Sequence, residues 1–211
     1  MDSVIKEILN SIPTFLKEFL NLLLSPRAYA SSGKVFEPSR FNDALGFLAV
    51  SLVVTLVLKA PMFSTELSAI PYLAADGFWK FFIVLLETVV IQFAWRLVKG
   101  KGTISHYLVA NFFYFGVFTV LGHTVKLMGH EFEIYVESFA NSRFFVLLFY
   151  LITGFPLFVW MVTCWRAYVD FNTAKFKQSL WVLILIGALS AITYFLARLL
   201  RDALFGSIFI A

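Results

Sequence analysis

One carboxylate lies inside a long apolar run, and it is the strongest candidate in the sequence for a chemical role. Glu87 falls near the middle of residues 77–97, a run of the length needed to cross a bilayer as a helix. A bare charge at that depth costs at least about 2.5 kcal/mol, so this side chain must be neutral, paired or hydrated. It is a candidate for a proton or cation relay, or for a polar contact to a substrate headgroup.

Three further polar residues are predicted to accompany Glu87. Gln92 follows in the same run, while Asn111 and Tyr114 reach matching depths if the next run folds back as a hairpin. These four residues form a predicted intramembrane polar cluster. Interhelical hydrogen bonding that only fixes packing is the favoured explanation, because polar side chains inside membranes commonly bond between helices.

Nitrogen and oxygen ligands gather in residues 122–142. The candidates are His123, His130, Glu131, Glu133 and Glu137. Their spacing matches no specific zinc motif, so a solvated acidic loop is the preferred interpretation and no metal site is assigned. His106, near the start of the preceding run, is interpreted as a boundary residue rather than a catalyst.

Gly154 and Pro156 interrupt the fourth apolar run. Proline lacks a backbone N–H and frees a carbonyl, which can shape a hinge or a cavity, although simple kinking is common in membrane helices.

Glycine-rich phosphate loops, paired cysteines, HExxH and Gly-x-Ser-x-Gly are absent, and Cys164 is the single cysteine. We assign no catalytic residue, no cofactor and no enzymatic activity.

Composition places these residues in a membrane protein. The 211 residues are 60% hydrophobic and 14% charged, and the mean hydropathy is +0.84, which is too apolar for the surface of a soluble domain. The net charge of +4 is spread between apolar runs rather than gathered in a patch, so nucleic-acid binding is not expected. The lipid bilayer is the predicted environment.

Five runs have the length and composition of spanning helices. They cover residues 41–62, 77–97, 103–127, 143–165 and 178–196. Short connections predict antiparallel hairpins between the second and third runs and between the fourth and fifth. The predicted fold is an all-α membrane protein, with a five-transmembrane-helix bundle over residues 41–211.

Residues 1–40 are predicted to form a cytoplasmic amphipathic helix and a polar linker. Pro13 is expected to break this helix into two. Apolar residues recur at helical spacing on one side and charged residues occupy the other, which is typical of a helix lying on a membrane surface. The apolar side comprises Ile5, Ile8, Leu9, Ile12, Leu16, Phe19, Leu20 and Leu23.

Lysine and arginine mark the predicted cytoplasmic side, because cationic loops are retained there. They precede the first run, separate the second from the third, and separate the fourth from the fifth. The other connections carry fewer cations. The N-terminus is therefore predicted in the cytoplasm and the C-terminus on the opposite side, although Arg198 and Arg201 near the far end of the last run oppose this orientation.

The order of parts resembles the Yip-domain family (Ypt-interacting proteins), five-span membrane proteins with a cytoplasmic N-terminus. The resemblance lies in "LNLLLSPRAYA", "FNDALGFLAVSLVVTLVL", "GTISHYLVANFFYFGVFTVLG" and "FPLFVWMVTCWRAYVDFNTAKFKQSLWVLILIGAL". It implies a non-enzymatic role in membrane organisation or trafficking, with other membrane proteins or a second copy as partners. The long polar N-terminal region of eukaryotic members is missing, which favours a short, prokaryote-like member in a bacterial inner (plasma) membrane.

Two other functions stay open from the residues alone. Glu87, Gln92 and Asn111, with the broken fourth run, are compatible with a small transporter or channel. An enzyme that acts on lipid is the weakest alternative, because no nucleophile and base pair is evident.

Overall fold

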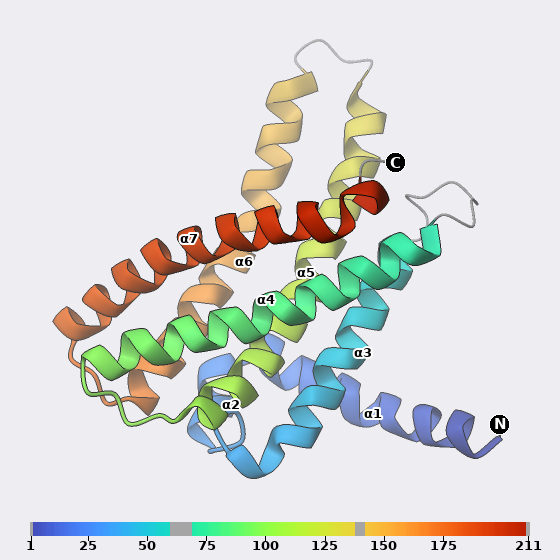
Figure 1. Cartoon of the computed structure of the whole chain (residues 1–211). Coiled ribbons are helices and arrows are strands. Elements are labelled where there is room, and N and C mark those ends of the chain that lie inside the picture. The colour runs from blue at the N-terminus through green and yellow to red at the C-terminus, as the bar shows by residue number, and fades with distance from the viewer. Residues whose placement is uncertain (1, 60–68, 138–141, 210–211) are drawn as a thin grey trace.

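The computed structural model describes residues 2–59, 69–137 and 142–209, and side chains over 12–59, 74–137 and 143–204. These residues form helices and connecting turns only, which confirms the all-α fold (Figure 1). In chain order the elements are α1 (Asp2–Leu24), α2 (Pro26–Ser31), the short 3-10 helix η1 (Pro38–Arg40), α3 (Phe41–Lys59), α4 (Ala69–Leu97), α5 (Ile104–Val136), α6 (Ser142–Phe171) and α7 (Phe176–Phe209).

Helices α3 to α7 are long and apolar enough to cross a membrane, so the chain is a multi-pass integral membrane protein. The start of α3 and the end of α4 lie where the sequence predicts them. The described part of α3 ends at Lys59 and α5 begins one residue later than predicted, whereas the start of α4, the end of α5 and both ends of α6 and α7 extend past the apolar runs, because a helix need not stop where the hydrocarbon does. The prediction of an acidic loop over residues 122–142 is wrong for residues 122–136, since α5 remains helical to Val136 and contacts α6 through stacked Phe132 and Phe149 rings, 4.9 Å apart. Residues 138–141 of that range lie outside the described part of the chain.

Helix α5 is the centre of the bundle and packs against α3, α4 and α6. Of its most apolar stretch, 56% is buried inside the protein, against 6% for α6 and 11% for α7. Gly116 allows the close approach of α5 to α3, because a Cβ atom there would stand 2.8 Å from both the Phe47 ring and the Ser51 hydroxyl of α3. Small residues commonly let membrane helices approach in this way.

One of the two predicted hairpins is formed. Helices α4 and α5 pack together, as expected from their short connection, whereas α7 leaves α6 and packs along α4 (Figure 1). The turn that redirects the chain contains Thr173 with a φ of 50° and Asn172, whose side-chain oxygen accepts hydrogen bonds from the Lys101 N–H and the Tyr107 hydroxyl. The prediction of an α6–α7 hairpin is therefore wrong.

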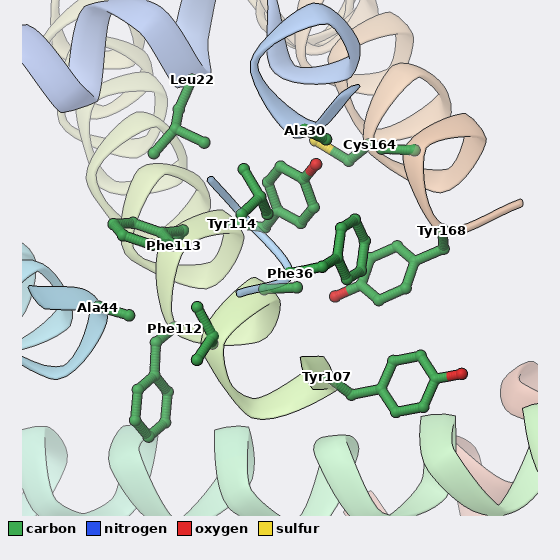
Figure 2. Close-up of a cluster of buried hydrophobic side chains, with 14 of the residues drawn as sticks. Leu22, Ala30, Phe36, Ala44, Tyr107, Phe112, Phe113, Tyr114, Cys164 and Tyr168 are labelled. Atoms are coloured by element: carbon green, nitrogen blue, oxygen red, sulfur yellow. The ribbon is translucent and has the colours of Figure 1, made fainter. Parts of the chain in front are cut away.

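Helix α1 continues through Pro13, so the predicted break is also wrong. A proline within a helix removes one hydrogen bond, and the packing of the residues that follow Pro13 offsets that loss here. Phe15 lies 4.9 Å from Phe47 of α3, measured between ring centroids, and Leu22 is fully buried. The N-terminal segment thus shares the main hydrophobic core with α5 and α6 (Figure 2).

Candidate functional site: an intramembrane cavity beside Glu87

A cavity of about 470 Å³ lies among α4, α5, α6 and α7. Its walls are mostly apolar and rich in aromatic rings, and Glu87 is the one formally charged side chain among its described lining residues. Pockets of this size and character commonly bind small molecules. The lining comprises Val84, Glu87, Ile91, Asn111, Tyr114, Phe115, Phe118, Phe158, Trp160, Met161, Val162, Cys164, Trp165, Tyr168 and Leu183.

Ser190 of α7 donates a hydrogen bond of 2.6 Å to Oε2 of Glu87 on α4. Among the described residues it is the one hydrogen-bond partner of this carboxylate. The contact joins two helices that are far apart in sequence, and the prediction missed it because Ser190 lies inside a run that reads as uniformly apolar.

Asn111 is buried where α4, α5 and α6 meet. Its Nδ2 donates to the Thr88 hydroxyl at 2.7 Å, and its Oδ1 accepts from the Tyr168 hydroxyl. Both ends of the amide are therefore bonded to neighbouring helices. This arrangement supports the packing interpretation for Asn111, because satisfied polar groups hold membrane helices in register.

Tyr114 and Gln92 have separate roles. The Tyr114 hydroxyl donates to the Pro26 carbonyl at 3.4 Å, which ties α5 to α2. Gln92 lies outside the cavity, where its amide oxygen can accept from Arg96 Nε at 3.3 Å and from the Ile104 N–H at 3.2 Å. Five residues along a helix rotate a side chain about 140° from its starting face, so Gln92 and Glu87 point in different directions.

The structure thus brings Glu87, Asn111 and Tyr114 to one cavity and separates Gln92 from them.

No protein-family model matches the chain, and no match was found among curated proteins or solved structures. The resemblance to the Yip-domain family therefore stays a prediction, and functional arguments depend on the geometry of this chain.

The predicted hinge lies in an uninterrupted helix. Helix α6 runs through Gly154 and Pro156, and a Cβ atom at Gly154 would meet no other atom within 4 Å. Pro156 lines a second cavity of about 920 Å³ between α6 and the junction of α1 with α2. Bending at this position stays a prediction.

The histidines have local roles. His123 lies on α5, where Nδ1 contacts the Thr119 carbonyl at 2.9 Å and Nε2 lies 3.2 Å from Lys80 Nζ. His106 caps the start of the same helix through Thr103. Within the described part of the chain, no three histidine, cysteine or acidic side chains are placed to hold a metal ion.

An ion-pair network that the sequence analysis missed joins α3 to α4 near His123. Asp76 Oδ2 lies 2.6 Å from Lys59 Nζ and 3.0 Å from Lys80 Nζ, and all three side chains are less than one-fifth exposed. The i,i+4 spacing of Asp76 and Lys80 is a signal that could have indicated part of it. Because these charges are largely shielded from water, removing one of them leaves the others without compensation, which destabilises the fold.

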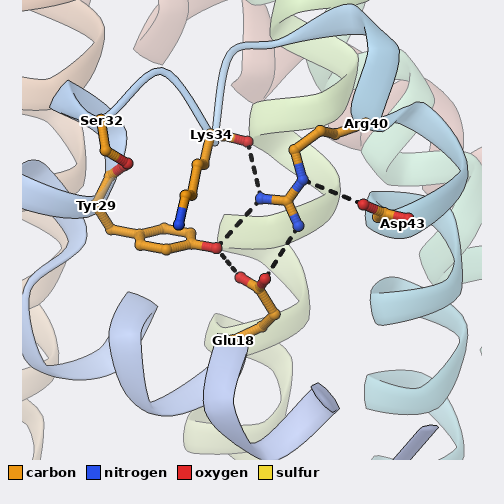
Figure 3. Close-up of polar contacts among 6 residues, drawn as sticks. All are labelled: Glu18, Tyr29, Ser32, Lys34, Arg40 and Asp43. Atoms are coloured by element: carbon orange, nitrogen blue, oxygen red, sulfur yellow. Dashed lines mark hydrogen bonds and ion pairs between the residues drawn. The ribbon is translucent and has the colours of Figure 1, made fainter.

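A second polar network fastens the N-terminal segment to the bundle (Figure 3). The Arg40 guanidinium donates to Glu18 Oε1 at 3.0 Å, to the Tyr29 hydroxyl at 3.2 Å and to Asp43 Oδ2 at 3.2 Å, while Tyr29 donates to Glu18 Oε2. On the other side of α2, Arg27 pairs with Asp170 of α6 at 2.6 Å. Helices α1 and α2 are therefore held by charge as well as by apolar packing.

The Tyr29 network predicts loss of stability in strong alkali. Burial, with help from the Glu18 carboxylate, raises the pKa of Tyr29 to about 12. Because this folded-state pKa exceeds the ordinary value of 10.0, the stability contribution is complete below pH 10 and is lost as pH rises through about 12. The free energy of unfolding of the detergent-solubilised protein, measured from pH 9 to 12.5, should fall less steeply with pH in Tyr29→Phe than in the unchanged chain. Identical slopes in the two proteins would contradict the assignment.

Proposed function

We propose that the protein is a non-catalytic membrane-organising or partner-binding subunit of Yip-domain type, and that its α1 helix works in the cytoplasmic leaflet. The observation that carries this proposal is that the apolar side of α1 is wider than its contact with the bundle. Phe15, Phe19 and Leu23 pack against the core. A second stripe faces outward and consists of Ile12, Leu16, Leu20 and Leu24, which are 42% to 76% exposed.

A helix that only covered the bundle would need an apolar side no wider than that contact. The outward stripe recurs every fourth residue over three helical turns, which suits a helix half-embedded among headgroups and acyl chains. Figure 1 shows α1 crossing the direction of α3 and α5 rather than running along them. A helix fixed in this way can displace lipid in one leaflet or offer its outer side to another membrane protein.

The proposed orientation has the N-terminus in the cytoplasm. Three segments support it by meeting at one end of the molecule: α2, the turn after α4 and the turn after α6, which are joined by Arg27 to Asp170 and by Lys101 to Asn172. These segments carry cations that are retained on the cytoplasmic side of bacterial inner membranes, the proposed location.

Photocrosslinking tests this function. A photoreactive amino acid at Leu20, activated in native membranes, is expected to yield adducts with lipid acyl chains or with a membrane protein, which mass spectrometry of the purified chain distinguishes. The same amino acid at Lys99, an exposed turn residue at the same end, should react mainly with water. Equal adduct patterns at the two positions, together with a solitary monomer in gentle detergent, would refute the proposal.

A small transporter or channel is the second candidate, favoured by the placement of Glu87 at a cavity within the membrane. In proteoliposomes, the unchanged chain would then carry protons or cations at a measurable rate. Glu87→Gln should abolish most of that flux, because the amide cannot take up or release a proton at ordinary pH. Absence of flux in the unchanged chain, or unchanged flux in the variant, removes this candidate.

A further inference from the structure

The cavity beside Glu87 has the two features that recognise an organic cation. Aromatic rings line it from α5 and α6, and the faces of such rings attract positive charge, most strongly when water is excluded. A single carboxylate supplies the opposite charge. Figure 2 shows Tyr114, Tyr168 and Cys164, three of the lining residues, converging from α5 and α6.

Among the polar groups of the cavity, Glu87 is the one that can still accept a further hydrogen bond or an ionic contact. Asn111 is bonded at both ends of its amide, and the Tyr168 and Tyr114 hydroxyls each donate to an acceptor in the protein. Glu87 accepts only from Ser190, through Oε2, so Oε1 has no hydrogen-bond donor among the described residues. A carboxylate oxygen in apolar surroundings is stabilised most by a cation.

Access from the membrane follows from the packing of α6 and α7. These helices border the cavity but do not pack along one another, because α7 lies against α4 instead. Outward-facing residues at this border, such as Phe158 and Leu183, are themselves apolar and exposed. A molecule dissolved in the acyl chains can therefore reach the cavity sideways without passing through water.

We infer that this cavity binds a lipophilic organic cation, a molecule with an apolar aromatic or aliphatic body around a single delocalised or quaternary positive charge. Glu87 neutralises the charge, and the aromatic side chains of α5 and α6 enclose the body. The volume of about 470 Å³ is in the range of cavities that hold drug-sized molecules. This binding requires neither transport nor a partner protein, so it is independent of both functions proposed above.

Tetraphenylphosphonium is the probe, compared with neutral tetraphenylsilane and anionic tetraphenylborate, which have the same four-ring shape. Equilibrium binding of the radiolabelled cation to the purified chain in nanodiscs should be saturable. Glu87→Gln should weaken it by about tenfold or more, because one partner of an enclosed charge pair is lost. The neutral silane should bind the variant and the unchanged chain alike, whereas the borate, which the Glu87 carboxylate repels, should bind the variant at least as well as the unchanged chain.

Three variants keep the test decisive. Glu87→Asp retains the charge and should still bind the cation, and Glu133→Gln makes the same chemical change at an exposed position on α5 and should bind it like the unchanged chain. Met161→Trp fills the cavity without touching the carboxylate and should weaken binding even if Glu87→Gln fails to fold. Non-saturable uptake, equal affinity in Glu87→Gln, equal affinity for the silane, or undiminished binding in Met161→Trp would each overturn the inference.

Discussion

Replacing Gly116 by leucine is expected to cost at least about 3 kcal/mol of folding free energy, the upper part of the range for overpacking a well-filled core. The Cβ atom alone would stand 2.8 Å from the Phe47 ring and from the Ser51 hydroxyl. Either α3 must move away from α5 or both side chains must leave their positions. Since α5 is the most buried helix, the loss should spread through the bundle.

Gly122→Leu is the matched control for Gly116→Leu. It lies on the same helix, and a Cβ atom there would meet no atom within 4 Å. Unfolding by sodium dodecyl sulfate, followed by circular dichroism, measures both variants against the unchanged chain. Equal stability of the two variants would show that α3 and α5 do not approach as closely as described.

Asp76→Asn is expected to destabilise the fold by about 3 kcal/mol, the usual cost of removing one partner from a buried ion pair. The substitution leaves the Lys80 ammonium, 16% exposed, beside His123 without the carboxylate that lies 3.0 Å away. Because the cost comes from the charge left behind, adding Lys80→Met should recover a substantial part of it. The double-mutant cycle isolates this coupling.

An exposed ion pair is the control for Asp76. Asp202 pairs with Arg201 at 2.8 Å near the end of α7, and its side chain is 50% exposed. Asp202→Asn should change stability by less than about 1 kcal/mol, because water replaces the lost partner. If Asp76→Asn is as mild as Asp202→Asn, or if Lys80→Met adds to the damage, the network does not stabilise the junction of α3 and α4.

The sequence was sufficient to predict the five spanning helices, because long apolar runs have few alternatives in lipid. It predicted the ends of elements less well. Residues 128–136 read as a loop from their histidine and glutamates, yet Gly129 and Phe132 lie against α6 and keep the segment helical. Contact with a neighbouring helix decided the structure there, and no local pattern records such contacts.

The candidate site was predictable only in part for the same reason. Glu87 stands out by its chemistry, and Asn111 lies at the depth expected from the α4–α5 hairpin. Ser190, which binds Glu87, comes from α7, whose place beside α4 contradicts the expected hairpin with α6. The prediction that Gln92 joins the polar cluster is wrong, because it used only the depth of the residue in the membrane. The direction in which a helical side chain points also decides which residues meet.

The pairing of α7 with α4 bears on how this chain is made. Helices enter the membrane in the order of synthesis, so α4 must wait there until α7 follows it. The Ser190 donor is made 103 residues after Glu87, and for that interval the carboxylate has no final partner. The insertion machinery or retained water must shelter it, so biogenesis of this protein should be most sensitive to truncations that remove only the last helix.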